Sequence, residues 1–593
     1  MVKIELDRVY WGPSIYAADP IVVVRVSVED NFMDTLKEYM VTMTDTFADW
    51  LPKEIQRGGD DVGRSVAHFL VEWSLGIING SYGYIQSAGA RSINGKIHAW
   101  LGFNDPKISL DHIFLARNLL LEIGGGRMSA QEAVSVVDKF VENSRARHPD
   151  FQARILMRAA FLRNIPYQNF APAWRHWRFG WGANSELFFE SSSEKDSFLG
   201  QKIVRNKDAN KVYMSALGAP VAKHILVSEV DELEKVENSI GFPCVLKPID
   251  SSQAKGVTVD IRVSGELKEA FFSARKLSNS PVMVERHLPG DVHRLLVVKG
   301  RFVAATRRLP ATVVGDGSSN IVELAESFNR RRVSGARPGH HLGPVPFDAE
   351  FDRVLAGQGL SRDSIPEINT RVRLRQIPLL GTGADNVDVT DLVHEDTKFV
   401  SESLAKTLSL SVVGFDFVST DIAKSCHEKG AFLEMNLCPS LRGHMQDGED
   451  IRNVADHVLG NSLGRVPSVL VVTDTLSVES AKQLLARYPG LGWRFTDGVG
   501  VGGCLFDKVA LGNPIAASFA LLSNKCVERI LFICTDTELM SFGMPLDRVD
   551  HAVEQTDLDF HWSEVLIRHS GAYTKVSDAI DLEHLLAMCF PVM

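Results

Sequence analysis

Cysteine is scarce in this sequence, and the cysteines that occur are not paired. Seven of them are spread singly along 593 residues, with no CxxC motif. This spacing supports neither a disulfide framework nor a zinc cluster, since both need cysteines in groups. We therefore expect reduced thiols, as in a cytoplasmic protein.

Blocks of basic residues and long apolar runs are absent as well. The 64 Lys and Arg residues against 74 Asp and Glu residues give a net charge of −10, without the basic patch that nucleic-acid binding requires. No run of about 18 apolar residues occurs, and the first residues, MVKIELDRVYWGP, lack the apolar core of a signal peptide. The sequence predicts a cytoplasmic protein that binds neither nucleic acid nor membranes.

The composition that is present is that of a large globular protein. At roughly 150 residues per domain, the chain length predicts three or four folded units. Residues 1–163 mix alternating segments such as Ile21–Val28 with helical ones such as Asp111–Ile123, which indicates an α/β domain without a catalytic motif. The aromatic and basic stretch Ala173–Ala183 is interpreted either as a packed connector or as a ligand contact, with neither favoured.

Charged residues inside apolar strands are the most informative feature of residues 200–460. Four strand-like segments carry them, namely GFPCVLKPID, PVMVERHLPG, SVVGFDFVSTD and GAFLEMNLCPS. An unpaired charge is costly to bury, so a strand that carries one on its inner face usually directs it at a metal, a counter-ion or a ligand. The recurrence predicts a polar site built from several strands.

Asp416, Glu434 and Asn436 form a candidate metal site. Glu434 and Asn436 are two residues apart on one strand-like segment, so both side chains lie on the same face. Asp416 precedes Glu434 by 18 residues, on what we expect to be the neighbouring antiparallel strand. Two carboxylates and an amide oxygen are ligands that suit Mg²⁺. The alternative is that the acidic residues face solvent on a half-exposed sheet.

Two lysines upstream of the acidic strands are candidate phosphate ligands. Lys247 lies in an apolar strand and Lys207 in the segment RNKDANK, and either ammonium could neutralise phosphate oxygens. The loop DSSQAKGV follows Lys247, and its small residues, Gly256 among them, let backbone N–H groups approach a phosphate. Each lysine alone is more often a surface residue, and the loop alone is a weak motif. The more specific signal is the order along the chain, in which the two lysines, the small-residue loop and Glu285 precede Asp416, Glu434 and Asn436.

That order resembles the ATP-grasp fold, in which two α+β subdomains hold ATP between them. RNKD, VLKP, VERHLPG, GFDFV and EMNLCPS follow one another at roughly the family's spacing, and the match is closer still to cyanophycin synthetases. Longer blocks such as FGWGA, IGFPCVLKPID and LGTGADNVDVTDLVHED extend the resemblance over about residues 164–450. It implies an ATP-grasp domain over residues 164–463, with ATP and Mg²⁺ as cofactors.

The resemblance also implies roles for individual residues. Lys207 and Lys247 match the family's ATP-phosphate lysines, and Glu285, together with the strand end after it in VERHLPG, matches the adenine-side contacts. Arg294 and Arg308 match basic residues that face the reacting carboxyl group, where they would act in catalysis.

The sequence departs from the family pattern at several positions. The phosphate loop reads DSSQAKGV where the family is closer to DGNHGRGV, so Lys255 replaces an arginine and glycine is reduced. The acidic residue expected at the ribose is Asp291, one place earlier than in the family. Leu379 and Ser440 replace a polar residue and a glycine. Such changes fit a divergent paralogue or a weakened ATP site.

Residues 464–593 resemble a shortened form of the Mur-ligase-like domain that two-step cyanophycin synthetases use as a second ATP site. PSVLVVTDTLSVESA resembles its strand, P-loop and helix start. However, Asp474, Ser477, Val478 and Glu479 stand where glycine, glycine, lysine and threonine are expected. The negative charges of Asp474 and Glu479, and the replacement of the phosphate-binding lysine by Val478, disfavour triphosphate binding at this segment. We predict a degenerate domain with a structural or dimerising role.

The predicted fold class is multidomain α+β and α/β, with an N-terminal α/β domain over residues 1–163, the ATP-grasp domain, and the truncated Mur-ligase-like α/β domain. With one intact ATP site, the resemblance points to the shorter type of cyanophycin synthetase, which polymerises β-Asp-Arg dipeptides through an acylphosphate. The expected partners are the dipeptide, the end of a cyanophycin chain and a second copy in a homodimer. The alternatives are a ligase for another amino acid or peptide, a non-catalytic polymer-binding paralogue, and a two-site enzyme that works without a P-loop.

Overall fold

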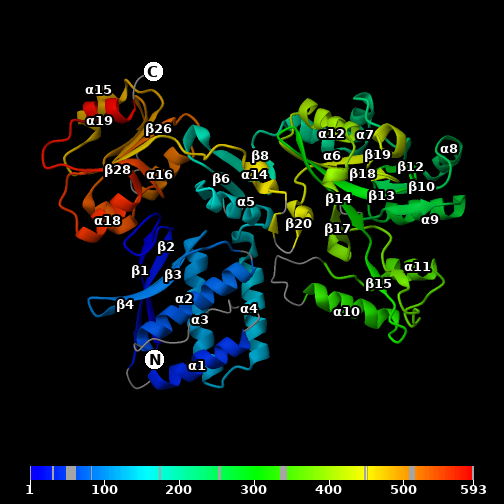
Figure 1. Cartoon of the computed structure of the whole chain (residues 1–593), viewed down its shortest axis with the longest axis horizontal. Helices are drawn as coiled ribbons and strands as arrows, with labels where there is room; N and C mark the ends of the chain where they lie inside the picture. Colours follow the sequence, from blue (N-terminus) through cyan, green and yellow to red (C-terminus); the bar gives the residue numbers. More distant parts are fainter. Residues whose placement is uncertain are drawn as a thin grey trace. The chain divides into compact units, whose positions relative to one another are not determined.

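The protein is a multidomain α+β chain that forms two compact units. The computed structural model describes residues 2–29, 33–47, 62–81, 83–171, 175–251, 255–333, 343–446, 449–450, 452–506 and 514–590. One unit consists of Met1–Phe188 together with Asn461–Met593, and the other of Phe189–Gly460 (Figure 1). The first unit therefore contains both ends of the chain, and the three-part division predicted from the sequence stays a prediction.

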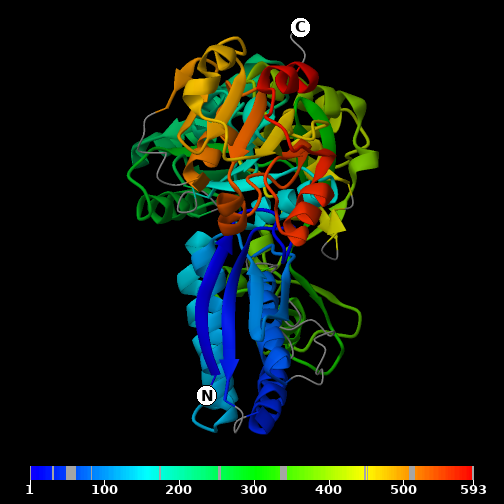
Figure 2. The ribbon, with the colours of Figure 1, turned by 90° about the vertical axis from the view of Figure 1, so that its left-hand side faces the viewer.

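The N-terminal part of the first unit is an antiparallel sheet, in the order β1-β2-β4-β3, with helices α2 and α3 packed on it (Figure 2). Its strands are β1 (Val2–Tyr10), β2 (Ile21–Val28), β3 (Ala88–Ile93) and β4 (Lys96–Gly102). Its helices are α1 (Met33–Thr46), α2 (Val62–Ser81), α3 (Pro106–Gly124), α4 (Ala130–Ser144) and α5 (Phe151–Leu162).

Strand β2 is apolar on both faces because it borders two cores. Val22 and Val24 join the cluster beneath the helices. Ile21 and Val23 point the other way, as alternation along a strand requires, and join a cluster made mostly of C-terminal residues.

A short connector follows α5. It contains β5 (Tyr167–Ala171), β6 (His176–Phe179) and β7 (Glu186–Phe189), and β5 and β6 pair antiparallel. Trp177 and Trp181 are buried, and Trp181 belongs to the core shared with the C-terminal residues. This burial favours the packed connector over the ligand contact for Ala173–Ala183, of which residues 173 and 174 lie outside the described residues.

The C-terminal part of the first unit is a seven-stranded sheet in the order β25-β24-β23-β26-β22-β27-β28. Five neighbouring strands, β23, β26, β22, β27 and β28, run parallel to one another. Strand β24 pairs antiparallel with β23, and β25 pairs antiparallel with β24. The strands are β22 (Ser468–Val472), β23 (Leu491–Phe495), β24 (Gly498–Val501), β25 (Cys504–Leu505), β26 (Arg529–Cys534), β27 (Val549–Glu554) and β28 (Ser570–Lys575). The helices are α15 (Val478–Leu485), α16 (Pro514–Leu522), α17 (Asp536–Phe542), α18 (Phe560–Arg568) and α19 (Leu582–Cys589).

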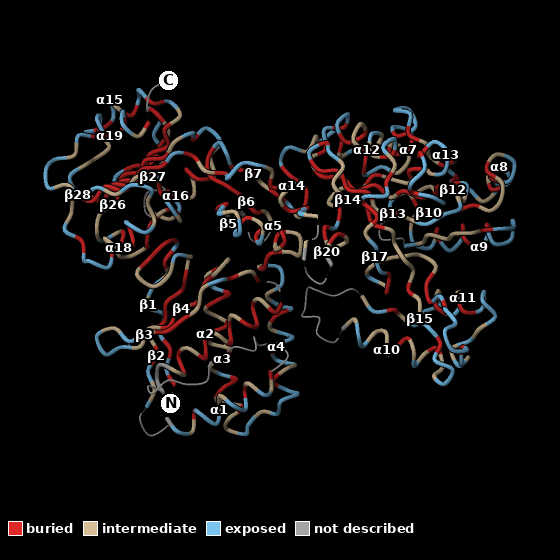
Figure 3. Tube along the Cα trace, viewed as in Figure 1, coloured by how far each residue is buried: buried red, intermediate tan, exposed pale blue. Residues whose placement is uncertain are grey.

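The two ends of the chain share a hydrophobic core in this unit. Tyr10 and Ile21 pack in one buried cluster with Leu470 and Trp562. Figure 3 colours buried residues red, and much of strand β27 in this unit is red. Backbone hydrogen bonds join the ends as well, since the N–H of Trp11 donates to the carbonyl of Phe542 at 2.9 Å. The C-terminal residues are therefore part of the fold of the N-terminal sheet.

The second unit begins with a four-stranded antiparallel sheet in the order β11-β10-β12-β9. Helices α8 and α9 cover one face, where Leu246 and Val284 are buried. The elements are β9 (His224–Val227), α8 (Leu233–Ser239), β10 (Cys244–Pro248), β11 (Thr258–Ile261), α9 (Ser264–Arg275) and β12 (Val282–Arg286).

A five-stranded antiparallel sheet follows, in the order β17-β14-β13-β18-β19, with α6, α7 and α12 packed against it. Its strands are β13 (Asp291–Val298), β14 (Arg301–Leu309), β17 (Asp385–Asp388), β18 (Val412–Ser419) and β19 (Gly430–Asn436). The helices are α6 (Phe198–Arg205), α7 (Lys207–Ala216), α12 (Glu395–Thr407) and α13 (Cys426–Lys429).

The chain between β14 and β17 forms a small layer with its own core around Phe351 and Val372. It consists of β15 (Thr312–Val314), α10 (Ile321–Val333), α11 (Ala349–Ala356) and β16 (Arg371–Arg373). The unit also contains β8 (Ser192–Ser193), β20 (Met445–Gln446), β21 (Glu449–Asp450) and α14 (Val454–Leu459). Across the part of the chain that the structure describes, no helix is both long and apolar enough to span a bilayer.

Candidate active site

The five-stranded sheet has one apolar face and one polar face, because apolar and polar residues alternate along its strands. Leu295, Phe415 and Phe432 lie in the buried core on the apolar face. The pairing register places polar residues of all five strands on the other face: Asn386 and Asp388 of β17, Thr306 and Arg308 of β14, Arg294 of β13, Asp416 of β18, and Glu434 and Asn436 of β19.

Asp416 lies at the centre of this polar face. It stands opposite Arg294 on one neighbouring strand and opposite Glu434 on the other. Its Oδ1 is 3.3 Å from Arg294 Nε and 3.7 Å from Arg308 Nη2, and Asn436 Nδ2 donates to its Oδ2 at 3.2 Å. The antiparallel pairing expected from the 18-residue spacing is confirmed.

The two carboxylates differ in their electrostatic surroundings. Burial would raise the pKa of Asp416, but Arg294 and Arg308 bring it below its ordinary value. Burial and the neighbouring charge of Asp416 raise the pKa of Glu434. The Asp416 and Glu434 carboxylates therefore repel each other, and a cation bound between them would remove that repulsion.

The donor set fits Mg²⁺. Asp416 Oδ1 is buried and accepts no hydrogen bond of good geometry, and the Nδ2 of Asn436 is engaged, which leaves its amide oxygen for a metal. Two carboxylates and one amide oxygen suit a hard cation that completes its shell with phosphate oxygens and water. Within the described residues, no group of three or more His, Cys, Asp or Glu side chains could hold a metal. The assignment of Asp416, Glu434 and Asn436 to Mg²⁺ stays a prediction.

The four-stranded sheet contributes a buried cluster of opposite charges. Lys247 Nζ lies 2.9 Å from Glu285 Oε1, and Lys211 Nζ lies 2.7 Å from Glu285 Oε2. Burial would raise the pKa of Glu285, but Lys247 and Lys211 lower it to about 2. Burial lowers the pKa of Lys211. Burial alone would lower the pKa of Lys247 too, but the charges of Glu285 and Glu434 raise it.

Both carboxylate oxygens of Glu285 are thus occupied by lysines, and the side chain is only 5% exposed. Its side chain holds the predicted phosphate lysine Lys247 in place. The chain after Glu285 remains the predicted adenine-side contact.

Lys207 connects α7 with the predicted phosphate loop. Its ammonium donates to the carbonyl of Pro248 at 3.0 Å and to that of Ser251. Burial lowers the pKa of Lys207, and the charge of Glu434 opposes this. The charge of Glu434 raises the pKa of both Lys207 and Lys247, and Asn210 of α7 donates to the carbonyl of Met435 at 3.0 Å, so α7 lies against the strand that carries Glu434.

Two other predicted contacts have less structural support. Gly256 has a positive φ of 72°, and a Cβ there would lie 3.0 Å from Pro248 Cγ, so the turn favours glycine. Residues 252–254 of the loop lie outside the described residues. Asp291 lies at the exposed start of β13, where its carboxylate pairs with Arg307 at 3.4 Å.

The segment predicted from the sequence to be a degenerate P-loop lies between β22 and α15. The N–H of Val478, at the start of α15, donates to the Asp497 carboxylate at 3.1 and 3.2 Å. Ser477 caps the same helix end through the N–H of Ser480. A carboxylate of the chain itself thus occupies the helix terminus to which a P-loop would bind phosphate. Glu479 beside it is exposed.

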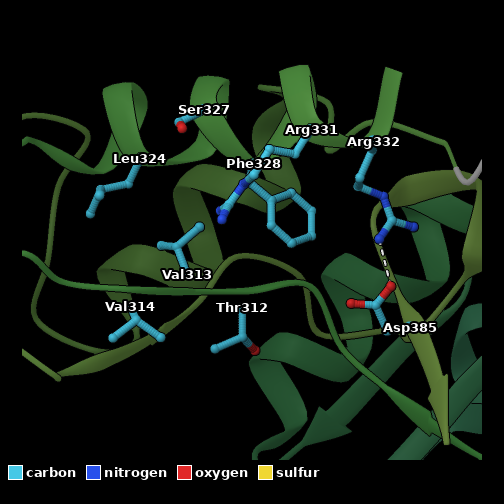
Figure 4. A pocket seen from close by; sticks show the side chains of 9 residues that line it. All are labelled: Thr312, Val313, Val314, Leu324, Ser327, Phe328, Arg331, Arg332 and Asp385. Atoms are coloured by element: carbon cyan, nitrogen blue, oxygen red, sulfur yellow. Dashed lines mark hydrogen bonds and ion pairs between the residues drawn. The ribbon is translucent and has the colours of Figure 1, made fainter. Parts of the chain in front are cut away.

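A cavity of about 640 Å³ lies beside β15 and α10 (Figure 4). Val313, Leu324 and Phe328 line its apolar part, and Arg331, Arg332 and Asp385 its charged part. Arg332 Nη1 lies 2.6 Å from Asp385 Oδ1, and its guanidinium lies 5.1 Å from the centre of the Phe328 ring. Arg331 is exposed at the cavity, and no ion pair of its own is found among the described residues.

The sequence reasoning missed Lys211 and His444. Lys211 lies one helical turn after Lys207, so the spacing could have placed both on one face of α7. His444 ends the 3₁₀-helix Leu441–His444, which packs against β14 and β17. No periodic pattern in the sequence places it there.

Comparison with known proteins relates the chain to cyanophycin synthetases. The enzyme named cyanophycin synthetase of Trichormus variabilis is 32% identical over 386 residues, which are 63% of this chain and 42% of that protein. The one of Crocosphaera subtropica is 30% identical over 453 residues, 72% of this chain and 52% of that protein. The chain thus spans about half the length of these relatives.

A more distant similarity is to a solved structure. The bifunctional glutathione synthetase structure from Pasteurella multocida is 21% identical, with a TM-score of 0.41, over 60% of this chain and 50% of that one. No family model matches the chain.

Proposed function

We propose that this chain is an ATP-dependent carbon–nitrogen ligase that joins β-Asp-Arg dipeptides to the end of a cyanophycin chain. Two findings support the proposal. One is the similarity to cyanophycin synthetases. The other, which carries the argument, is the partly buried Asp416 flanked by Arg294 and Arg308 and set opposite Glu434. Such an arrangement suits a reaction in which phosphate and carboxylate charges must be held together.

Each cation of the site has a role in this reaction. Lys207 and Lys247 would bind the phosphates of ATP, and Mg²⁺ held by Asp416, Glu434 and Asn436 would neutralise phosphate charge when bound. Arg294 and Arg308 would hold the substrate carboxylate. That carboxylate attacks the γ-phosphorus to give an acylphosphate and releases ADP. An amine then attacks the acyl carbon, and phosphate leaves.

The choice of a preformed dipeptide rests on the C-terminal sheet. Cyanophycin carries arginine on an aspartate backbone, so assembly from free amino acids needs two kinds of amide bond. Asp497 occupies the helix terminus of the degenerate P-loop, which leaves the polar faces of the second unit as the one candidate ATP site within the described residues. One such site serves one kind of bond, and a β-Asp-Arg dipeptide already contains the other.

The experiment offers the purified chain ATP and Mg²⁺ with either β-Asp-Arg dipeptide or free aspartate plus arginine, and measures phosphate release and polymer mass. We expect polymer from the dipeptide alone. Polymer from free amino acids would refute the dipeptide proposal and support a two-site enzyme. Phosphate release without polymer would favour a ligase for another amino acid or peptide. Polymer binding without phosphate release would favour a non-catalytic paralogue.

The cavity beside α10 supports a substrate that carries both signs of charge. Arg331 could bind a carboxylate and Asp385 a guanidinium, and both groups recur along an aspartate–arginine polymer. A homodimer and a cytoplasmic location belong to the same proposal and rest on the resemblance to cyanophycin synthetases.

A further inference from the structure

His444 is a buried imidazole at the edge of the polar face. It is 3% exposed, at the end of the 3₁₀-helix Leu441–His444. The preceding carbonyl, of Gly443, accepts a hydrogen bond from Asn386 Nδ2 at 3.1 Å. Since Asn386 pairs with Arg308 across β17 and β14, this bond fixes His444 beside the predicted carboxylate-binding arginines.

Neither ring nitrogen of His444 has a hydrogen-bond partner among the described residues. Asn386 Oδ1 and Arg308 Nε are buried without a partner in the same region. Leaving a buried polar atom without a hydrogen-bond partner is costly, so folds rarely gather several such atoms in one place without a ligand. The gathering of these atoms indicates that the substrate, rather than the protein, satisfies them.

The charges around His444 keep it neutral before substrate binds. Burial, followed by the charge of Arg294, lowers its pKa to about 4, with Arg308 acting in the same direction and Asp388 against it. These three groups belong to β13, β14 and β17. Asp388 is itself paired with Arg452 at 2.6 Å. A bound carboxylate and phosphate would offset the arginines and return the pKa toward its ordinary value, which makes the imidazole a better proton acceptor when substrate is present.

Amide formation needs such an acceptor. At neutral pH the attacking amine is mostly an ammonium ion, and only the fraction that has lost one proton to water carries the lone pair that attacks the acyl carbon. The nitrogen must then lose a second proton as the amide forms, and this is the proton that needs an acceptor in the site. The arginines and lysines of the site only donate hydrogen bonds, and Asp416 and Glu434 are committed to the predicted metal. His444 is the uncharged acceptor beside the arginines.

We propose that His444 is the general base of the amide-forming step, a role that rests on the proposed ligase function. As the amine nitrogen bonds to the acyl carbon of the acylphosphate, its proton passes to a ring nitrogen of His444. The carbon–oxygen bond to phosphate then breaks, and phosphate leaves with the bonding electron pair. The protonated imidazole returns its proton to water after the product leaves.

The test separates the two half-reactions in the full chain. Wild type and His444→Gln are incubated with ATP, Mg²⁺ and β-Asp-Arg dipeptide, with and without hydroxylamine. Hydroxylamine is a neutral nucleophile at about pH 7.5 and traps the acylphosphate as a hydroxamate without needing a base. We expect hydroxamate to stay within about twofold of wild type and peptide formation to fall about 10²–10⁴-fold. We also expect the variant's peptide formation to recover as the pH rises and more amine is deprotonated.

The matched control is His457→Gln, at an exposed histidine of α14, which should leave both readouts unchanged. His444→Ala provides a second variant, in which added imidazole should restore peptide formation. Hydroxamate and peptide falling together, with no rescue by imidazole, would overturn the proposal, as would unchanged peptide formation in both variants. A wild-type protein that yields neither product would refute the ligase function itself, and the role of His444 with it.

Discussion

The Glu285 cluster allows the sharpest prediction about stability. Replacing Glu285 with Gln leaves Lys211 and Lys247 buried without the carboxylate with which both form their ion pairs. A fall in the pKa of Glu285 from 4.5 to about 2 corresponds to about 3 kcal/mol of interaction. This agrees with the loss of about 3–5 kcal/mol usual when one partner of a buried ion pair is removed. We expect Glu285→Gln to destabilise the second unit by about 3 kcal/mol.

The positions of the tryptophans allow the unfolding of the two units to be measured separately. All nine lie in the first unit, at Trp11, Trp50, Trp73, Trp100, Trp174, Trp177, Trp181, Trp493 and Trp562. Tryptophan fluorescence therefore follows unfolding of the first unit, and hydrogen exchange of peptides from β10 and β12 follows the second. We expect the variant to exchange there about 100-fold faster, with its fluorescence transition unchanged.

The pH dependence has a definite sign. The pKa of Glu285 is lowered in the folded state, so its contribution is complete above its unfolded value of about 4.5 and is lost as the pH falls toward about 2. The difference between wild type and variant should be constant from about pH 6 to about pH 8.

Glu326→Gln is the matched control, because Glu326 forms an exposed pair with Arg330 at 3.9 Å in the same unit. It should change stability by less than about 1 kcal/mol. A Glu285→Gln variant as stable as this control would refute the account of the cluster.

Four further predictions follow from the same structure. Glu434→Gln should abolish ATP-dependent phosphate release through loss of metal charge, whereas Glu479→Gln, at the degenerate P-loop, should leave the rate within about twofold. Arg331→Ala should raise the KM for dipeptide or polymer and leave that for ATP unchanged, which steady-state kinetics would show. Deleting residues 464–593 should expose Ile21 and its neighbours and lower the solubility of the protein, as measured by size-exclusion chromatography. A Glu434 variant with the wild-type rate of phosphate release, an Arg331 variant with the wild-type KM, or a soluble truncated chain would each contradict the role given to the altered residues. For Glu479, a large loss of rate would do so.

Much of the polar face could be predicted from the sequence because its order is local. Polar residues two apart on a strand, such as Glu434 and Asn436, share a face, and the spacing of Asp416 and Glu434 fits one antiparallel pair. Asp416 and Glu434 are aligned by the pairing of two strands that are close together in the sequence, so this part of the site follows from a short segment.

The partners of Glu285 could not be predicted in the same way. Lys247 and Lys211 lie 38 and 74 residues away along the chain, on different elements, and meet only in the tertiary fold. The C-terminal residues are a similar case. Their sequence indicated a degenerate domain, but not that Leu470 and Trp562 would complete the core of the N-terminal sheet.

The most direct test of the ligase account follows oxygen from the substrate into phosphate. β-Asp-Arg dipeptide and polymer, both labelled with ¹⁸O in their carboxylates, are incubated with the chain, ATP and Mg²⁺, and the released phosphate is analysed by mass spectrometry. Formation of an acylphosphate predicts that one labelled oxygen appears in phosphate for each amide bond formed. Amide bonds formed with unlabelled phosphate, or no phosphate release at all, would contradict it.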